Sequence, residues 1–168
     1  MAQQIKWGVL GAASIAIQRM MPAMREAPSA TLHALASRDE GKARAVAAKF
    51  EAPRAYGDYD SLLADPEIDA VYVPLPNQLH FEWSIRALAA GKHVLCEKPL
   101  CLTSREVERL CIARDRAGKP LSACTAAELD LLEPEEELLV EEPDPLEDFA
   151  ADQHQTAGDG VDFAWSHG

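Results

Sequence analysis

Residues 5–16 read IKWGVLGAASIA, in which a short apolar run reaches Gly11 and gives way to small residues. Gly11, Ala13 and Ala16 occupy the three small positions of the pattern G-x-G-x-x-G/A, which follows the first strand of a dinucleotide-binding unit. Glycine permits the tight turn, Ala13 leaves space for a pyrophosphate beside the backbone, and Ala16 lets a helix pack closely on the strand. By itself, the pattern fits a phosphate-binding turn and a merely well-packed strand-to-helix turn equally well.

Downstream of this turn, β-rich apolar segments alternate with amphipathic helical segments. Ala43, Val46, Ala47 and Phe50, for example, form one apolar stripe at helical spacing. The predicted strands cover residues 5–11, 31–37, 54–57, 69–76, 93–100 and 119–123. Pro22 is expected either to kink the first intervening helix or to mark a break in it. Strands that alternate with helices of this length pair in parallel through right-handed crossovers, so the predicted fold is α/β, a doubly wound parallel sheet.

Charge divides the chain into two parts. Residues 1–121 contain all 16 Lys and Arg and 14 of the 28 Asp and Glu, whereas residues 122–168 contain the other 14 acids and no Lys or Arg. We therefore predict a domain over 1–121 and an acidic tail over 122–168, and we expect the tail to be mostly disordered because its charges repel one another. A partner-binding acidic peptide is the alternative. Either way, the acidic balance argues against nucleic acid as a partner.

Several classes of protein are not favoured by the sequence. No run of about 18 apolar residues is present, and the first residues lack the basic and apolar regions of a signal peptide, so we expect a cytoplasmic protein without a membrane partner. The four cysteines show no CxxC pair and no metal-ligand spacing with the histidines. Reduced thiols and no metal site are expected.

In a doubly wound sheet, ligands bind outside the carboxyl ends of the strands. The second predicted strand ends at Ser37, Arg38 and Asp39, where the adenosine ribose of a dinucleotide would lie. Arginine beside a hydroxyl suits the 2′-phosphate of NADP, whereas an acid at this point would favour NAD. The order of the residues favours NADP and leaves NAD open. Alternatively, Arg38 is a solvated surface charge, and Ser37 or Asp39 caps the next helix.

The segment VPLPNQLH, residues 73–80, ends the fourth predicted strand. Pro74 and Pro76 are rigid residues that could form a wall beside a flat nicotinamide ring, and Asn77 could exchange hydrogen bonds with it or cap the next helix. His80 is a candidate base if it faces the site, and a surface histidine otherwise.

The segment HVLCEKPL, residues 93–100, ends the fifth predicted strand in Glu97 and Lys98. Alternation along a strand directs these two side chains to opposite sides. A lysine at the edge of a nicotinamide site could pass a proton to or from a substrate hydroxyl. The alternative is a Glu97–Lys98 ion pair with no chemical role.

Taken together, WGVLGAASIA, ASRD and the run from AYGDYD to CEKPL closely resemble the amino-terminal Rossmann domain of the Gfo/Idh/MocA oxidoreductases, from Ile5 to Leu121. The motif AGKHVLCEKP, residues 90–99, is specific to that family. The resemblance implies hydride transfer between NAD(P) and a sugar or polyol, with Lys98 as the catalytic proton-transfer residue. It also implies a cofactor site at Gly11, Ala12, Ala13, Ser14, Ile15, Ser37, Arg38, Leu75, Pro76, Asn77, His80, Glu97 and Lys98.

The sequence departs from the family after GKPL, residues 118–121. Family members continue into a large antiparallel sheet domain that holds the sugar, and no downstream segment here has the length or alternation for such a sheet. The resemblance therefore predicts a truncated or frame-shifted chain that is poorly active alone. A non-catalytic NADP-binding module and a gene remnant are the alternatives, and the oligomeric state is left open.

Overall fold

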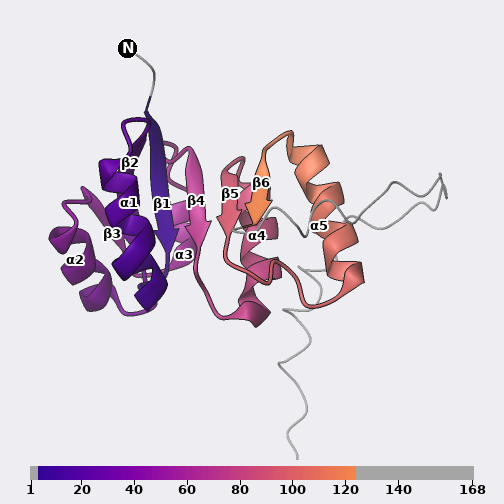
Figure 1. Cartoon of the computed structure of the whole chain (residues 1–168), viewed down its shortest axis with the longest axis horizontal. Helices are drawn as coiled ribbons and strands as arrows, with labels where there is room; N and C mark the ends of the chain where they lie inside the picture. Colours follow the sequence, from indigo (N-terminus) through magenta and orange to yellow (C-terminus); the bar gives the residue numbers. More distant parts are fainter. Residues whose placement is uncertain (1–3, 124–168) are drawn as a thin grey trace, which may run out of the picture. The chain divides into compact units, whose positions relative to one another are not determined.

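The computed structural model describes residues 4–123, which form one six-stranded parallel sheet flanked by helices (Figure 1). The strand order is β3-β2-β1-β4-β5-β6, and every neighbouring pair is parallel. The strands are β1 (Ile5–Leu10), β2 (Ala30–Ala36), β3 (Arg54–Tyr56), β4 (Ala70–Val73), β5 (His93–Cys96) and β6 (Leu121–Ala123). All six predicted strands are confirmed, and β6 runs two residues past the predicted domain boundary at 121. The remainder of the predicted acidic tail, 124–168, lies outside the described residues.

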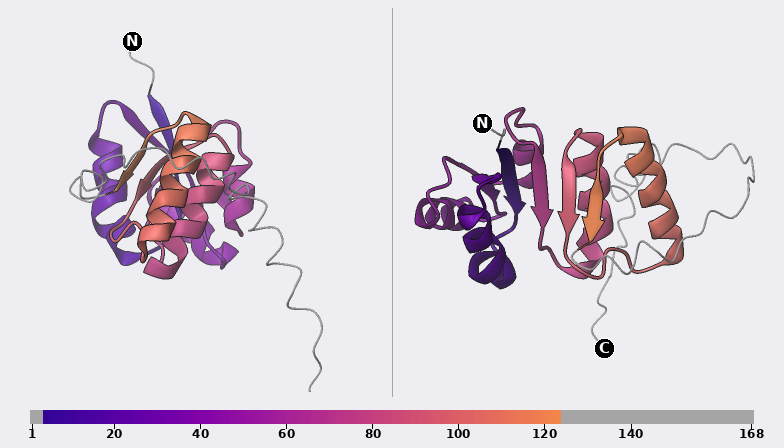
Figure 2. Two further views of the ribbon diagram at one scale, coloured as in Figure 1. Left: turned by 90° about the vertical axis from the view of Figure 1, so that its right-hand side faces the viewer. Right: turned by 45° about the horizontal axis from the view of Figure 1, so that its top comes forward.

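Helices cover both faces of the sheet, as the parallel pairing requires (Figure 2). They are η1 (Ala16–Met20), α1 (Met21–Glu26), α2 (Glu40–Lys49), α3 (Tyr59–Leu63), η2 (Asn77–Leu79), α4 (His80–Ala89) and α5 (Ser104–Ala117). Apolar residues of η1, α1 and α2 pack on one face in a cluster that includes Met21 and Tyr72. Apolar residues of α3, α4 and α5 form a second cluster on the other face, with Leu62, Leu88 and Leu110 fully buried.

The segment around Pro22 remains helical throughout. Helical conformation runs from Ser14 to Glu26, and the five residues of η1 widen into a π-turn directly before α1. Proline has no N–H, and in a regular α-helix its ring crowds the carbonyl four residues earlier. The π-turn of η1 includes Gln18, whose carbonyl the Pro22 ring would crowd in a regular helix. Pro22 therefore distorts the helix without breaking it.

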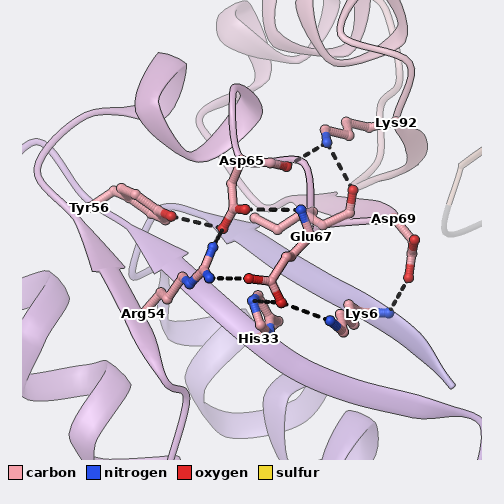
Figure 3. A network of polar contacts seen from close by, with 9 residues as sticks. Lys6, His33, Arg54, Tyr56, Asp65, Glu67, Asp69 and Lys92 are labelled. Atoms are coloured by element: carbon pink, nitrogen blue, oxygen red, sulfur yellow. Dashed lines mark hydrogen bonds and ion pairs between the residues drawn. The ribbon is translucent and has the colours of Figure 1, made fainter.

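A network of polar side chains lies at the amino ends of the strands and holds the loop between α3 and β4 (Figure 3). At its centre is Asp65, whose side chain is 2% exposed. The Asp65 carboxylate accepts hydrogen bonds from the Arg54 guanidinium (2.6 Å), the Tyr56 hydroxyl (2.8 Å) and the Glu67 backbone N–H (2.9 Å). Burial acts to raise the pKa of Asp65, but these hydrogen bonds outweigh it and lower the pKa to about 2.

The same loop is held from the β5 side by Lys92, which is 6% exposed. Its ammonium group donates to the carbonyl oxygens of Asp65 (2.7 Å) and Ile68 (2.9 Å), and burial lowers the pKa of Lys92. From the β1 side, the Lys6 backbone N–H donates to the Asp69 carboxylate (2.8 Å). We call these contacts, together with those of Asp65, the amino-edge network. Apart from Tyr56, which ends β3, these residues lie toward the amino ends of the strands, opposite the edge where the predicted site residues lie.

Candidate dinucleotide site

The predicted site residues all follow carboxyl ends of strands, and these ends share one edge of the parallel sheet (Figures 1 and 2). The chain order reverses between β1 and β4, because β1 pairs with β2 on one side and with β4 on the other. Such a switch point is where doubly wound sheets bind their ligands. The four segments that follow β1, β2, β4 and β5 are therefore the candidate site.

The turn after β1 is built around Gly11, whose φ is +100°. Its backbone N–H donates to the Ala36 carbonyl oxygen at the end of β2 (2.8 Å), and a Cβ at Gly11 would lie 2.9 Å from Leu75 Cδ2. Glycine is therefore required by the backbone conformation, and a side chain there would also displace the end of the Leu75 side chain. The turn is held between the end of β2 and the turn after β4.

Past Gly11, Ala12 and Ala13 are half-buried, while Ser14 and Ile15 are exposed where the helix begins. The first N–H groups of a helix have no partner within the helix, and the helix dipole favours negative charge there. Small, accessible residues at such a turn leave room for an anionic group beside the backbone. This arrangement fits the pyrophosphate of a dinucleotide.

At the end of β2, Ser37 is buried and Arg38 is exposed. The Ser37 backbone N–H donates to the Tyr56 carbonyl oxygen (3.1 Å), and the Ser37 hydroxyl accepts from the Asp39 N–H (3.3 Å). Asp39 caps α2 by accepting from the Lys42 N–H (3.0 Å), which confirms the capping alternative for Asp39. Ser37 and Arg38 therefore lie at the site edge, with the arginine in solvent.

At the turn after β4, Leu75 is buried, while Pro76 and Asn77 are exposed. The side chain of Asn77 caps neither helix, because the N-cap of η2 is Pro76, the N-cap of α4 is Leu79, and neither helix has a side-chain cap bond. The capping alternative for Asn77 is therefore wrong.

His80 fits neither of the two predicted alternatives. Its side chain is not on the surface, since the residue is 1% exposed. Its Nδ1 lies 2.6 Å from the Pro99 carbonyl oxygen, and its Nε2 lies 2.7 Å from the Leu75 carbonyl oxygen. Because both nitrogens face main-chain carbonyls, His80 does not present a free base to a ligand.

At the turn after β5, Glu97 is half-buried and Lys98 is exposed. The Glu97 carboxylate accepts a hydrogen bond from the Tyr72 hydroxyl, and the Glu97 N–H donates to the Val73 carbonyl oxygen (3.1 Å). Within residues 4–123, the salt bridges do not include a Glu97–Lys98 pair, so this alternative is wrong. Glu97 is held by β4, and the Lys98 ammonium is left toward solvent.

Tyr72 is the residue that sequence reasoning missed. It is fully buried in β4, within an otherwise aliphatic strand. A buried tyrosine hydroxyl usually finds a hydrogen-bond partner, so a tyrosine in such a strand was a signal that a polar group lies nearby. Its partner, Glu97, is 25 residues away in the sequence, and only the pairing of β4 with β5 brings the two together.

The structure joins the segments after β4 and β5 through His80, which contacts the Leu75 and Pro99 carbonyls. Leu75 also lies beside the turn after β1, because a Cβ at Gly11 would be 2.9 Å from Leu75 Cδ2. Two exposed cations, Arg38 and Lys98, lie at this edge. In the described part of the chain, no group of three or more His, Cys, Asp or Glu is arranged to hold a metal ion. None of the helices found between residues 4 and 123 is both long and apolar enough to cross a membrane.

A doubly wound sheet of this strand order, with a glycine turn at its switch point, defines a dinucleotide-binding Rossmann domain. Comparison with known sequences agrees, because the Gfo/Idh/MocA oxidoreductase family, which has an NAD-binding Rossmann fold, matches residues 5–124. The chain belongs to this family. It is an NAD(P)-binding Rossmann domain of the oxidoreductase type.

Similar proteins include several that act on sugars. The chain is 53% identical over 115 residues to an uncharacterised oxidoreductase of Rhizobium meliloti, and covers 34% of that protein with 68% of its own length. It is 50% identical over 110 residues to a dTDP-3,4-didehydro-2,6-dideoxy-α-D-glucose 3-reductase of Saccharopolyspora spinosa, with 66% of this chain and 33% of the relative covered. The chain thus spans about a third of the length of these relatives.

A solved structure of an oxidoreductase also resembles this domain. A 3-ketoreductase from Actinomadura kijaniata, crystallised with NADP and TDP-benzene, superposes with a TM-score of 0.71 at 41% identity. The match covers 73% of this chain and 37% of the ketoreductase. At this identity the likeness extends beyond the fold to the sequence of the domain.

Proposed function

We propose that residues 4–123 bind NADP at the candidate site and that NAD is the weaker ligand. The observation that carries this proposal is the exposed Arg38 beside the buried Ser37 at the carboxyl end of β2. The adenosine ribose of a dinucleotide lies at this strand end, and an arginine there accommodates the 2′-phosphate. Further support comes from the Actinomadura ketoreductase, which was crystallised with NADP.

The roles of the other site residues follow from their positions. The turn at Gly11, Ala12, Ala13, Ser14 and Ile15 would receive the pyrophosphate. The exposed residues Pro76 and Asn77 would border the nicotinamide end, and Leu75, His80 and Glu97 would support this end of the site from behind. A bound nicotinamide would supply the hydride acceptor or donor.

Arg38→Ala tests whether Arg38 favours NADPH over NADH by binding the 2′-phosphate. Loss of the guanidinium is expected to weaken NADPH binding about tenfold and to leave NADH binding nearly unchanged, because only NADPH carries the 2′-phosphate. Both dissociation constants are measured by titrating the full chain while its tryptophan fluorescence is followed. Lys42→Ala, which removes an exposed cation on α2, is the control. Equal losses for the two cofactors would show that Arg38 does not read the phosphate.

We further propose that Lys98 transfers the proton of a sugar or polyol hydroxyl. Its ammonium is exposed directly after β5, and the flanking Glu97 and Pro99 are held by contacts to the fold, so the lysine projects from a fixed segment. A positioned general acid or base contributes roughly 10²- to 10⁴-fold to a rate. The substrate class is proposed from relatives such as the Saccharopolyspora 3-reductase, of which this chain spans a third.

Reduction of NADP⁺ by a panel of sugars and polyols tests the role of Lys98. Any rate found is expected to fall about 10²-fold or more in Lys98→Ala and to persist in Lys42→Ala. A rate that survives in Lys98→Ala would exclude proton transfer by this residue. Saturable NADPH binding without a rate on any substrate would instead favour the non-catalytic binding module.

A further inference from the structure

The turn that carries Lys98 is attached to the turn after β4 by one buried side chain. His80 begins α4 and is 1% exposed. Its Nδ1 lies 2.6 Å from the carbonyl oxygen of Pro99, the residue after Lys98, and its Nε2 lies 2.7 Å from the carbonyl oxygen of Leu75. These carbonyls belong to the segments that follow β4 and β5, so one imidazole ring spans two of the four segments that form the site.

The two carbonyl contacts determine which nitrogen of the His80 ring must carry a proton. A carbonyl oxygen only accepts hydrogen bonds, so each contact becomes a hydrogen bond when the nitrogen that faces it carries a proton. The contact that matters for Lys98 is the one to Pro99, which needs a proton on Nδ1. Since the ring is buried, water does not compete for its nitrogens.

A second buried side chain holds the same turn from the other face of the sheet. Tyr72, which packs against η1, α1 and α2, donates its hydroxyl to the Glu97 carboxylate. Lys98 therefore lies between Glu97, whose carboxylate contacts Tyr72, and Pro99, whose carbonyl oxygen contacts His80. With both neighbours fixed, the main chain at Lys98 has little freedom to move.

We propose that His80 is a positioning residue, which ties the turn after β5 to the turn after β4 and so places Lys98 relative to the nicotinamide end of the site. This inference rests on the proposed role of Lys98. It differs from a base role, because His80 acts through main-chain carbonyls and does not touch the ligand. A glutamine at position 80 lacks the ring nitrogen Nδ1 that faces Pro99, and its single amide nitrogen can face only one of the two carbonyls.

The test follows the Lys98 ammonium directly. The chain has six lysines, so reductive methylation with ¹³C-formaldehyde gives few signals, and Lys98→Arg identifies the one from Lys98. In the full-length wild-type chain this signal is expected to shift on titration with NADP⁺. In His80→Gln the shift is expected to fall to less than half, while the dissociation constant of NADP⁺ changes less than about threefold. An unchanged shift in a folded His80→Gln overturns the proposal.

Ser84→Ala is the matched control, because Ser84 is fully buried and lies one turn further along the same helix. It is expected to keep the wild-type shift, which separates positioning of Lys98 from a general disturbance of α4. Should His80→Gln fail to fold, ¹⁵N spectra of the wild-type imidazole decide the question. A proton on Nδ1 is expected, and an unprotonated Nδ1 overturns the tie to Pro99. Absence of any NADP⁺ binding by the wild type would reject the proposed function, whereas the ring spectra would still decide the tie.

Discussion

Replacing Gly11 by alanine is expected to weaken NADPH binding about tenfold or more and to lower the free energy of unfolding by about 1–2 kcal/mol. The loss of stability comes from the backbone, because φ at Gly11 is +100°, a conformation that residues with a side chain rarely adopt. The loss of affinity comes from the contact, since the new Cβ would lie 2.9 Å from Leu75 Cδ2. Leu75 must move, and it belongs to the segment that borders the nicotinamide end of the proposed site.

Gly91→Ala is the control that separates these two effects. Gly91 also has a positive φ, +72°, but a Cβ there would meet nothing within 4 Å. Gly91→Ala is therefore expected to lose a similar amount of stability and to bind NADPH normally. Urea unfolding gives the first quantity and a fluorescence titration gives the second. Normal NADPH binding by Gly11→Ala would contradict the proposal that the segment of Leu75, beside this turn, borders the bound cofactor.

Replacing Asp65 by asparagine is expected to lower the free energy of unfolding by about 2 kcal/mol near neutral pH, because its pKa is lowered from 3.8 to about 2 in the folded chain. An asparagine cannot pair with Arg54 as a charged group. A lowered pKa stabilises the fold above the unfolded value, near 3.8, and this contribution is lost as the pH falls through about 2. The difference between wild type and Asp65→Asn is therefore expected to shrink at acid pH.

Urea unfolding of both proteins, at neutral pH and near pH 2, measures this difference. Glu51→Gln is the matched control, because Glu51 pairs with Arg25 at the surface and is 76% exposed. Exposed ion pairs contribute little, so this variant is expected to unfold like the wild type at both pH values. The same loss in Asp65→Asn at neutral and at acid pH would assign the effect to packing rather than to the charge.

The sequence by itself determined the α/β class, the six strands and the position of the glycine turn. These features are local, because a strand of apolar residues, a helical stripe and a glycine before small residues are each visible within about ten positions. The parallel sheet follows from the alternation of the elements, and with it the common edge on which Gly11, Ser37, Leu75 and Lys98 lie. The family resemblance then indicated which individual residues form the cofactor site.

Only the tertiary structure decided which partner each polar side chain has. His80 was expected either to face the site or to lie on the surface, and it is instead buried between two carbonyls, one of them 19 residues away. Glu97 was expected to pair with Lys98 or to border the cofactor site, and its carboxylate accepts a hydrogen bond from Tyr72. Such partners are set by strand order and helix packing, which bring together residues far apart in the chain. A local sequence pattern predicts where a side chain lies along a strand or helix. It does not predict which group of a neighbouring element contacts that side chain.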